Sequence, residues 1–205
     1  MEATVLQKRW ILYGAYAAIL SAIIYPVIYY LDISDRIDIL TGLLFAFSIG
    51  ISSIGIFHFG KIHRDGLCLQ IGGTLGVIAA LIFVLNIVVW HSLKAPLEEV
   101  LVKGDQSFVY SLTARIHYGF NFSWEILIAG SILSFGIAFF MQPKPGKVIA
   151  LLGIVVALVI LIFGFYAFPE KPETKNLVGI GPLLPFWHLV VAIFMISSLK
   201  WIKDK

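Results

Sequence analysis

The stretch "FNFSWEILIAGSILSFGIAFF", residues 120–140, contains a single charged side chain, Glu125, among apolar, small and uncharged polar residues. About 20 such residues in a helix cross the ~30 Å hydrocarbon core of a bilayer. The whole chain of 205 residues repeats this character, being 60% hydrophobic and only 13% charged, with a mean hydropathy of +0.95. Soluble domains are about 25% charged. The composition therefore predicts a multi-pass integral membrane protein. The expected location is the cell membrane.

Five further apolar stretches have the length of a membrane span. Each is expected to be a helix, because an isolated segment in lipid must satisfy its own backbone hydrogen bonds. None alternates in the way that barrel strands do. The predicted fold class is an all-α bundle of six transmembrane helices, forming one membrane domain over residues 1–205. The helices are expected at Trp10–Tyr30, Ile39–Phe59, Leu67–Trp90, Phe122–Met141, Val148–Phe168 and Pro182–Leu199.

The distribution of Lys and Arg predicts the orientation. Nine lie at one side of the spans and six at the other, where the connections are longer and most acidic residues also fall. By the positive-inside rule, both termini are expected in the cytoplasm. The first group is Lys8, Arg9, Lys61, Arg64, Lys144, Lys147, Lys200, Lys203 and Lys205; the second is Arg36, Lys94, Lys103, Arg115, Lys171 and Lys175. The small net charge of +3 is an orientation signal and does not indicate nucleic-acid binding.

The connections between spans differ in length. The short cytoplasmic turns "GKIHRDG" and "QPKPGK" predict antiparallel hairpins of the second with the third helix and of the fourth with the fifth. The connection from His91 to Asn121 is far longer, and loops of that length usually carry structure or function. Its apolar residues predict a short helix on the outer membrane surface, interrupted near Gly104.

Small residues recur at four-residue spacing in the second, third and fourth predicted helices. This spacing favours close helix packing, which matters in lipid because burial of apolar surface does not drive helix association there. The residues are Gly42, Ala46 and Gly50; Gly72, Gly76 and Ala80; and Gly130, Ser134 and Ala138.

Several polar side chains are predicted to lie at one level, near the outer boundary of the bilayer. The fourth and sixth helices enter from outside, which places Glu125 about one turn inside the boundary and His188 at a similar depth. The third helix ends outside, which places Asn86 and His91 near the same level. His117 precedes the fourth helix on that side and joins the group if its own segment folds over it.

Helical spacing links some of these residues. Tyr118, Asn121 and Glu125 share one face if the fourth helix begins early, and Ser111 is the least certain member of this stripe. The face continues as Ala129 and Gly136, which are small enough for a close neighbour. The predicted binding pocket comprises Asn86, His91, Tyr118, Asn121, Glu125 and His188.

The chemistry of this group of polar residues allows several interpretations. Intramembrane acids usually face a bundle interior or a wet cavity. Imidazole and carboxylate suit a transition metal, so that His91, His117, Glu125 and His188 form a candidate metal site, and His91 with His188 are the candidate axial pair for a haem. Alternatively, Glu125 and His188 exchange protons in a lipid or quinone headgroup pocket, as the candidate catalytic residues.

Simpler readings stand beside these. Glu125 could be a shallow carboxylate that reaches interfacial water or pairs with Arg115 or Lys94. His91 and His188 could be interfacial side chains that bond to backbone beside Trp90 and Trp187.

These readings define three classes of function. The absence of any catalytic motif favours a non-catalytic membrane subunit or module that binds lipid, a membrane-protein partner or a second copy through a polar pocket at the outer leaflet. The alternative is a membrane-embedded metal- or haem-dependent enzyme or redox protein. A small-solute transporter is weaker, because paired broken helices and charge at the midplane are not evident.

Overall fold

A computed structural model describes residues 2–31, 33–63, 66–102, 107–140, 142, 144–168 and 181–204. Six helices account for nearly all of them, so the predicted all-helical fold is confirmed. The helices are α1 (Val5–Tyr30), α2 (Asp35–His63), α3 (Leu67–Val102), α4 (Ser107–Phe140), α5 (Lys144–Ala167) and α6 (Leu183–Leu199). Two-residue strands, β1 (Glu2–Ala3) and β2 (Lys203–Asp204), precede and follow them.

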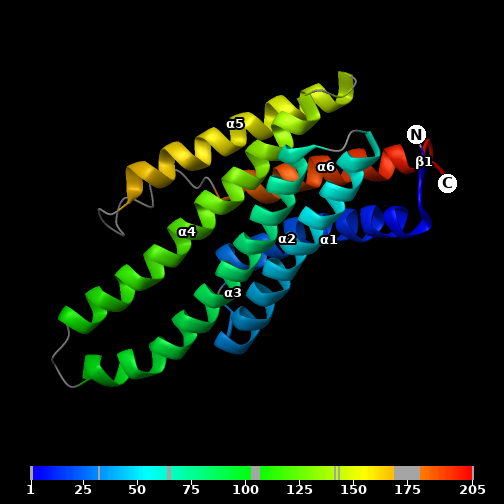
Figure 1. Ribbon diagram of the computed structural model, residues 1–205. Coiled ribbons are helices and arrows are strands. Elements are labelled where there is room, and N and C mark those ends of the chain that lie inside the picture. The colour runs from blue at the N-terminus through cyan, green and yellow to red at the C-terminus, as the bar shows by residue number, and fades with distance from the viewer. Residues whose placement is uncertain are drawn as a thin grey trace.

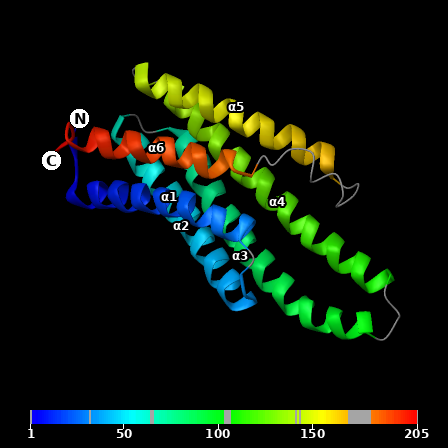
Figure 2. The same cartoon turned by 180° about the vertical axis from the view of Figure 1, so that it is seen from behind.

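Each helix from α1 to α5 packs against the next one in the chain, and α6 returns to lie along α1 (Figures 1 and 2). The pairs α2–α3 and α4–α5 are therefore neighbours, as the short turns predict. The two strands form a parallel pair, with Glu2 opposite Lys203, and so fix the two ends of the chain together. We call this end of the bundle the terminal end. The opposite end, where α3 passes into α4, is the hairpin end.

Five of the described helices are long and apolar enough to cross a membrane. The sixth, α6, has 17 residues and rises about 25 Å, somewhat less than the ~30 Å core. It begins part of the way along the bundle and runs back to the terminal end (Figure 1). The pairing of β1 with β2 places both termini at one end of the bundle. The structure is thus an all-helical bundle that is compatible with a multi-pass membrane protein.

The predicted loop between His91 and Asn121 is wrong in its main feature. Helix α3 continues to Val102 and α4 already begins at Ser107, so that both helices extend past their apolar spans. With 36 and 34 residues, they rise about 54 and 51 Å, well beyond the ~30 Å that a bilayer core needs. Hydropathy marks where the lipid ends, but a helix can continue in water. The predicted interruption near Gly104 lies outside the described residues.

The small residues lie where helices approach closely, as predicted. A Cβ placed on Gly72 would be 2.9 Å from the Phe135 ring of α4, and one on Gly42 would be 2.7 Å from Ile87 of α3. At Gly76 an added Cβ would collide with the hydroxyl of Ser53 and lie 2.9 Å from that of Ser131. Ser131 also donates a hydrogen bond of 2.6 Å to the carbonyl oxygen of Gly72, which joins α4 to α3.

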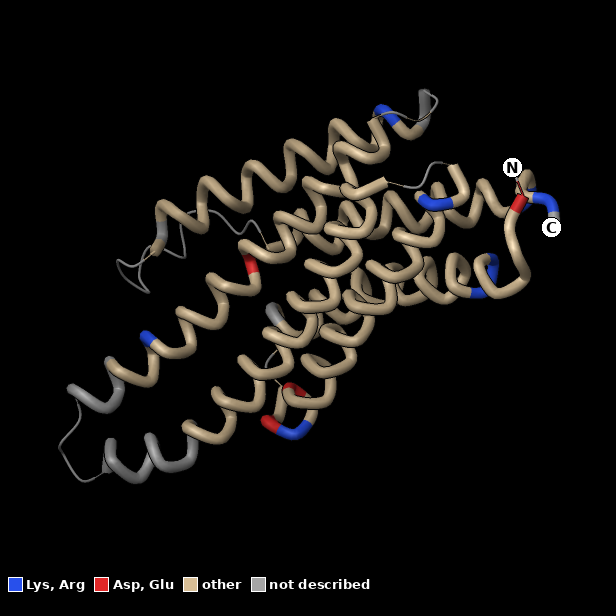
Figure 3. The backbone as a smooth tube through the Cα atoms, in the orientation of Figure 1, with Lys and Arg blue, Asp and Glu red and all other residues tan. Residues whose placement is uncertain are grey.

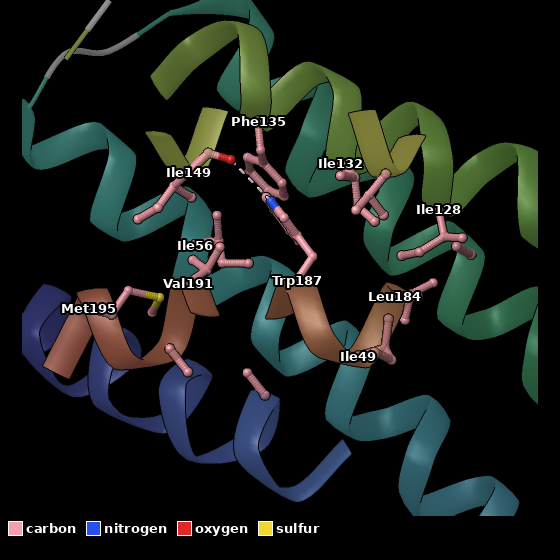
Figure 4. Packing of buried hydrophobic residues seen from close by; sticks show 14 of the residues in the cluster. Ile49, Ile56, Ile128, Ile132, Phe135, Ile149, Leu184, Trp187, Val191 and Met195 are labelled. Atoms are coloured by element: carbon pink, nitrogen blue, oxygen red, sulfur yellow. Dashed lines mark hydrogen bonds between the residues drawn. The ribbon is translucent and has the colours of Figure 1, made fainter. Parts of the chain in front are cut away.

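The core of the bundle is centred on Trp187 of α6 (Figure 4). Its indole is fully buried, stacks at 6.5 Å on the ring of Phe135 in α4, and donates its N–H to the carbonyl oxygen of Ile149 in α5 at 3.3 Å. Val191 and Met195 of α6 extend the same buried face. Trp187 therefore holds α6 against α4 and α5.

Candidate functional site

Glu125 lies in the middle of α4 and belongs to the bundle rather than to its lipid-facing surface. Its Oε1 atom accepts a hydrogen bond of 3.1 Å from the side-chain amide of Asn121, one helical turn earlier. A Cβ on Gly164 would lie 3.4 Å from its Oε2 atom, so the carboxylate faces α5 at a position without a side chain. Asn121 and Glu125 therefore share one face of α4, as predicted, and their side chains also form a hydrogen bond.

Aromatic rings lie beside Gly164, the position that this carboxylate faces. Phe122 stacks in parallel on Phe168, with ring centroids 4.2 Å apart, and meets Phe165 edge-on at 5.4 Å. Gly164 lies next to the same Phe122 ring. Beyond this level the α4 face continues as predicted, because Ala129 is fully buried and a Cβ on Gly136 would be 3.0 Å from Ile154 of α5. Of the other predicted stripe members, Tyr118 is half-buried, and the side chain of Ser111 lies outside the described residues.

Asn86 of α3 is a buried polar residue at the α3–α4 interface. Its neighbours along α3 show which part of α4 it meets: Phe83 packs on Trp124 at 4.9 Å, and Trp90 packs on His117 at 4.6 Å. Asn86 lies between these two contacts and so stands at the level of Asn121. It is 3% exposed, and its Oδ1 atom has no hydrogen-bond partner within the described part of the chain.

We call Asn86, Asn121, Glu125 and Gly164 the polar site. Its members come from α3, α4 and α5 and lie in the half of the bundle toward the hairpin end. Three of these four residues belong to two adjacent helices at one level, which is part of the group that the sequence predicts. Gly164 is the member that the sequence did not indicate. Only its position opposite a carboxylate distinguishes it from the other small residues of α5.

His91 has a different partner. Its Nε2 atom lies 3.2 Å from a carboxylate oxygen of Asp38 in the first turn of α2. This contact joins the start of α2 to α3 near the hairpin end. Asp38 was not among the predicted site residues, although the second helix starts on the side where the third ends. That topological relation is the signal that could have identified the pair.

His188 is also separate from the polar site. It is 1% exposed and its Nδ1 atom lies 3.0 Å from the carbonyl oxygen of Leu184. The backbone contact of the simpler prediction is thus present, but the side chain lies in the core of the bundle and not at an interface. Its neighbour Trp187 contacts Phe135 and Ile149 (Figure 4). Phe135 is ten residues along α4 from Glu125, and Ile149 is fifteen residues along α5 from Gly164, which are rises of about 15 and 22 Å. Glu125 and His188 are thus at different levels.

The short length of α6 explains this separation. The sequence predicts one level because each helix is assumed to enter the membrane at the same plane. Helix α6, however, begins at Leu183 inside the bundle, so that His188 falls near the Phe135 level. His117, in turn, packs on Trp90 and Tyr118. Over the described residues, no group of three or more His, Cys, Asp or Glu side chains is placed to hold a metal ion.

The fold defines the class of protein as an all-helical bundle compatible with a membrane, and the polar site within it is part-buried. No family model, curated protein or solved structure matches the chain.

Proposed function

We propose that this chain is a non-catalytic multi-pass membrane module that binds a hydrogen-bond donor, of the ammonium type, at the polar site in the outer-leaflet half of the bundle. The donor belongs to a lipid headgroup or to a membrane-protein partner. The observation that carries this proposal is the side-chain oxygen of Asn86, which is buried at the level of the Asn121–Glu125 pair and has no hydrogen-bond partner among the described residues.

The argument begins with the free energy of such an atom. A buried polar group without a hydrogen bond costs about 1–3 kcal/mol, which a purely structural interface would avoid by using leucine in place of asparagine. Polar groups inside membranes are by default candidates for function. An acceptor that a ligand completes explains why the chain carries this residue here.

The chemistry of the polar site defines the ligand. An amide oxygen and a carboxylate are acceptors, and Asn121 already uses its amide to donate to Glu125. The complement is a group rich in N–H donors, such as the ammonium of an aminophospholipid or of a partner's lysine. A carboxylate adds charge complementarity to a cation in a medium of low dielectric constant.

The test compares two lipids that differ in their N–H groups. Phosphatidylethanolamine has three N–H donors, whereas phosphatidylcholine has none and is otherwise similar. Native mass spectrometry and thermal unfolding of the purified protein should show retention and stabilisation by phosphatidylethanolamine above phosphatidylcholine. Glu125→Gln and Asn86→Leu should abolish the difference.

The same variants separate binding from folding. Asn86→Leu should raise the unfolding temperature of the protein without lipid, because it removes an unsatisfied buried oxygen, while it abolishes the lipid preference. Ser52→Ala is the matched control: the Ser52 hydroxyl is also buried without a partner among the described residues, but on α2 and outside the polar site. It should keep the lipid preference.

Two outcomes would redirect the proposal. A lipid preference that survives in Asn86→Leu and Glu125→Gln would exclude the polar site as the lipid site. If neither lipid stabilises the wild type, but cross-linking in membranes joins another protein at this site in the wild type and not in Glu125→Gln, then the donor is supplied by a partner. If wild type and variants behave alike in both assays, the proposed function is wrong.

A further inference from the structure

A continuous groove runs along the surface between α2 and α3, on the opposite side of α3 from the residues that contact α4. Its larger part has a volume of about 430 Å³, is nearest the terminal end, and is lined by Phe57, Gln70, Gly73 and Thr74 among others. A smaller part of about 170 Å³ continues it toward the hairpin end as far as Val84. Ile54 and Val77 line both parts, so the two form one groove.

Small residues produce this hollow. Gly50 lies so close to α3 that an added Cβ would be 3.3 Å from that of Ala80, and a Cβ on Gly73 would be 3.3 Å from that of Phe57. The backbones of α2 and α3 therefore approach closely at the floor of the groove. Larger side chains such as Phe47 and Leu81, both more than half exposed, form its walls.

The dimensions of the groove match a lipid chain. From Gln70 to Val84 it follows fourteen residues of α3, a length of about 21 Å. One leaflet of the hydrocarbon core is about 15 Å thick. An extended acyl chain that starts at the terminal-end boundary would thus lie in the groove over the depth of its own leaflet and slightly beyond.

The polar residues lie at one end only. Gln70 is in the first turn of α3, and the ammonium of Lys61, in the last turn of α2, lies 5.7 Å from the centre of the Phe57 ring that lines the groove. A cation and an amide donor at the mouth of an apolar groove complement a phosphate headgroup with an acyl chain attached. We propose that this groove binds an anionic phospholipid of the leaflet at the terminal end, with its phosphate at Lys61 and Gln70.

A second copy of this chain is a poorer occupant. Two copies inserted in the same orientation pack about an axis along the membrane normal, so residues at the same level meet across their interface. The Lys61 side chains of both copies would then approach each other, which like charges disfavour. The anionic lipid fits the same surface with opposite charge.

The test uses phosphatidylglycerol with a photoreactive group in its acyl chain, in vesicles that otherwise contain phosphatidylcholine. Irradiation should attach the lipid to peptides of α2 and α3 that line the groove. Lys61→Gln should lower this yield about fivefold, which is the contribution expected from one lysine to the binding of an anionic lipid. Thr74→Phe, which fills the groove from an exposed position, should remove it.

Matched controls lie on α5. Lys147 is an exposed lysine at the same end of the bundle, and Val155 is an exposed apolar residue within the span. Lys147→Gln and Val155→Phe should leave the cross-linking yield unchanged. Asn86→Leu should also leave it unchanged, so this inference and the function proposed for the polar site can fail separately.

Three results would overturn the proposal. The first is an equal loss in Lys61→Gln and Lys147→Gln, which would mean general attraction to a basic surface. The second is equal labelling by a phosphatidylcholine probe. The third is cross-linking of two protein chains through the groove that Thr74→Phe abolishes, which would assign the groove to a second copy.

Discussion

Gly14 of α1 and Gly55 of α2 bring two helix backbones into direct contact. A Cβ on Gly14 would lie 2.5 Å from the Cα of Gly55, and a Cβ on Gly55 would lie 2.9 Å from the carbonyl oxygen of Trp10. Because van der Waals contact is a main source of helix association in lipid, this approach is central to the α1–α2 pair. We expect Gly14→Ala to lower the free energy of unfolding by about 1–3 kcal/mol, measured by reversible unfolding in mixed micelles.

Gly119 supplies the matched control. It lies in α4, and among the described residues no atom comes within 4 Å of an added Cβ there. Gly119→Ala should therefore raise the free energy of unfolding by about 0.5–1 kcal/mol through helix propensity alone. If both variants changed stability in the same direction and by the same amount, close packing at Gly14 would not be the cause.

At the scale of residues, positions on one face of a helix could be predicted from the spacing in the sequence, whereas contacts between helices could not. The interval of four between Asn121 and Glu125 correctly predicts that their side chains share one face of the helix, because helical geometry alone places them there. The partners on other helices, Gly164 for Glu125 and Asp38 for His91, depend on how helices are offset along the bundle axis. A single sequence carries no information about this offset, so neither partner was predicted.

Helix α6 shows how one side chain can fix an element. It is the shortest of the helices, and Trp187 gives it contacts with both α4 and α5. We expect Trp187→Ala to lower the free energy of unfolding by about 3–5 kcal/mol, because it leaves a cavity at the centre of the bundle. Thermal unfolding of the purified protein measures this.

The control for this change is Trp201, which follows α6 and is 68% exposed. Trp201→Ala removes an identical side chain from the surface and should change stability by no more than about 0.5 kcal/mol. Trp187→Phe should fall between the two, since it keeps most of the packing but loses the N–H donor to Ile149. Equal effects at both tryptophans would show that α6 is held by other contacts.

At the scale of elements, apolar length predicts that a helix exists but not where it ends. All six predicted spans correspond to helices, and the small residues at Gly72 and Gly136 lie at close contacts, as expected. The predicted positions of the helix ends were wrong in both directions. The third and fourth helices extend far beyond their spans, whereas the sixth is too short to begin at the outer boundary. Both errors came from taking the bilayer as the limit of every helix.

For the molecule as a whole, the arrangement of charge and the position of the termini bear on its orientation. Figure 3 shows that lysine and arginine, and aspartate and glutamate, lie chiefly near the two ends of the bundle. The strand pair that joins the termini places the segment after Lys200 beside the segment before Lys8. These basic residues, with Lys61 and Lys147, concentrate positive charge at the terminal end, and from the positive-inside rule we predict that this end lies in the cytoplasm.

Accessibility to a reagent that cannot cross the membrane tests this orientation. After Cys68→Ser removes the native thiol, single cysteines are introduced as Arg115→Cys toward the hairpin end and Lys147→Cys at the terminal end; both positions are exposed. In intact cells, a membrane-impermeant maleimide should label the variant at position 115 at once. The variant at position 147 should be labelled only after the membrane is permeabilised. The reverse pattern would place the polar site in the inner leaflet and the α2–α3 groove mouth outside. Labelling of both positions from one side would contradict the crossing of the membrane by α4.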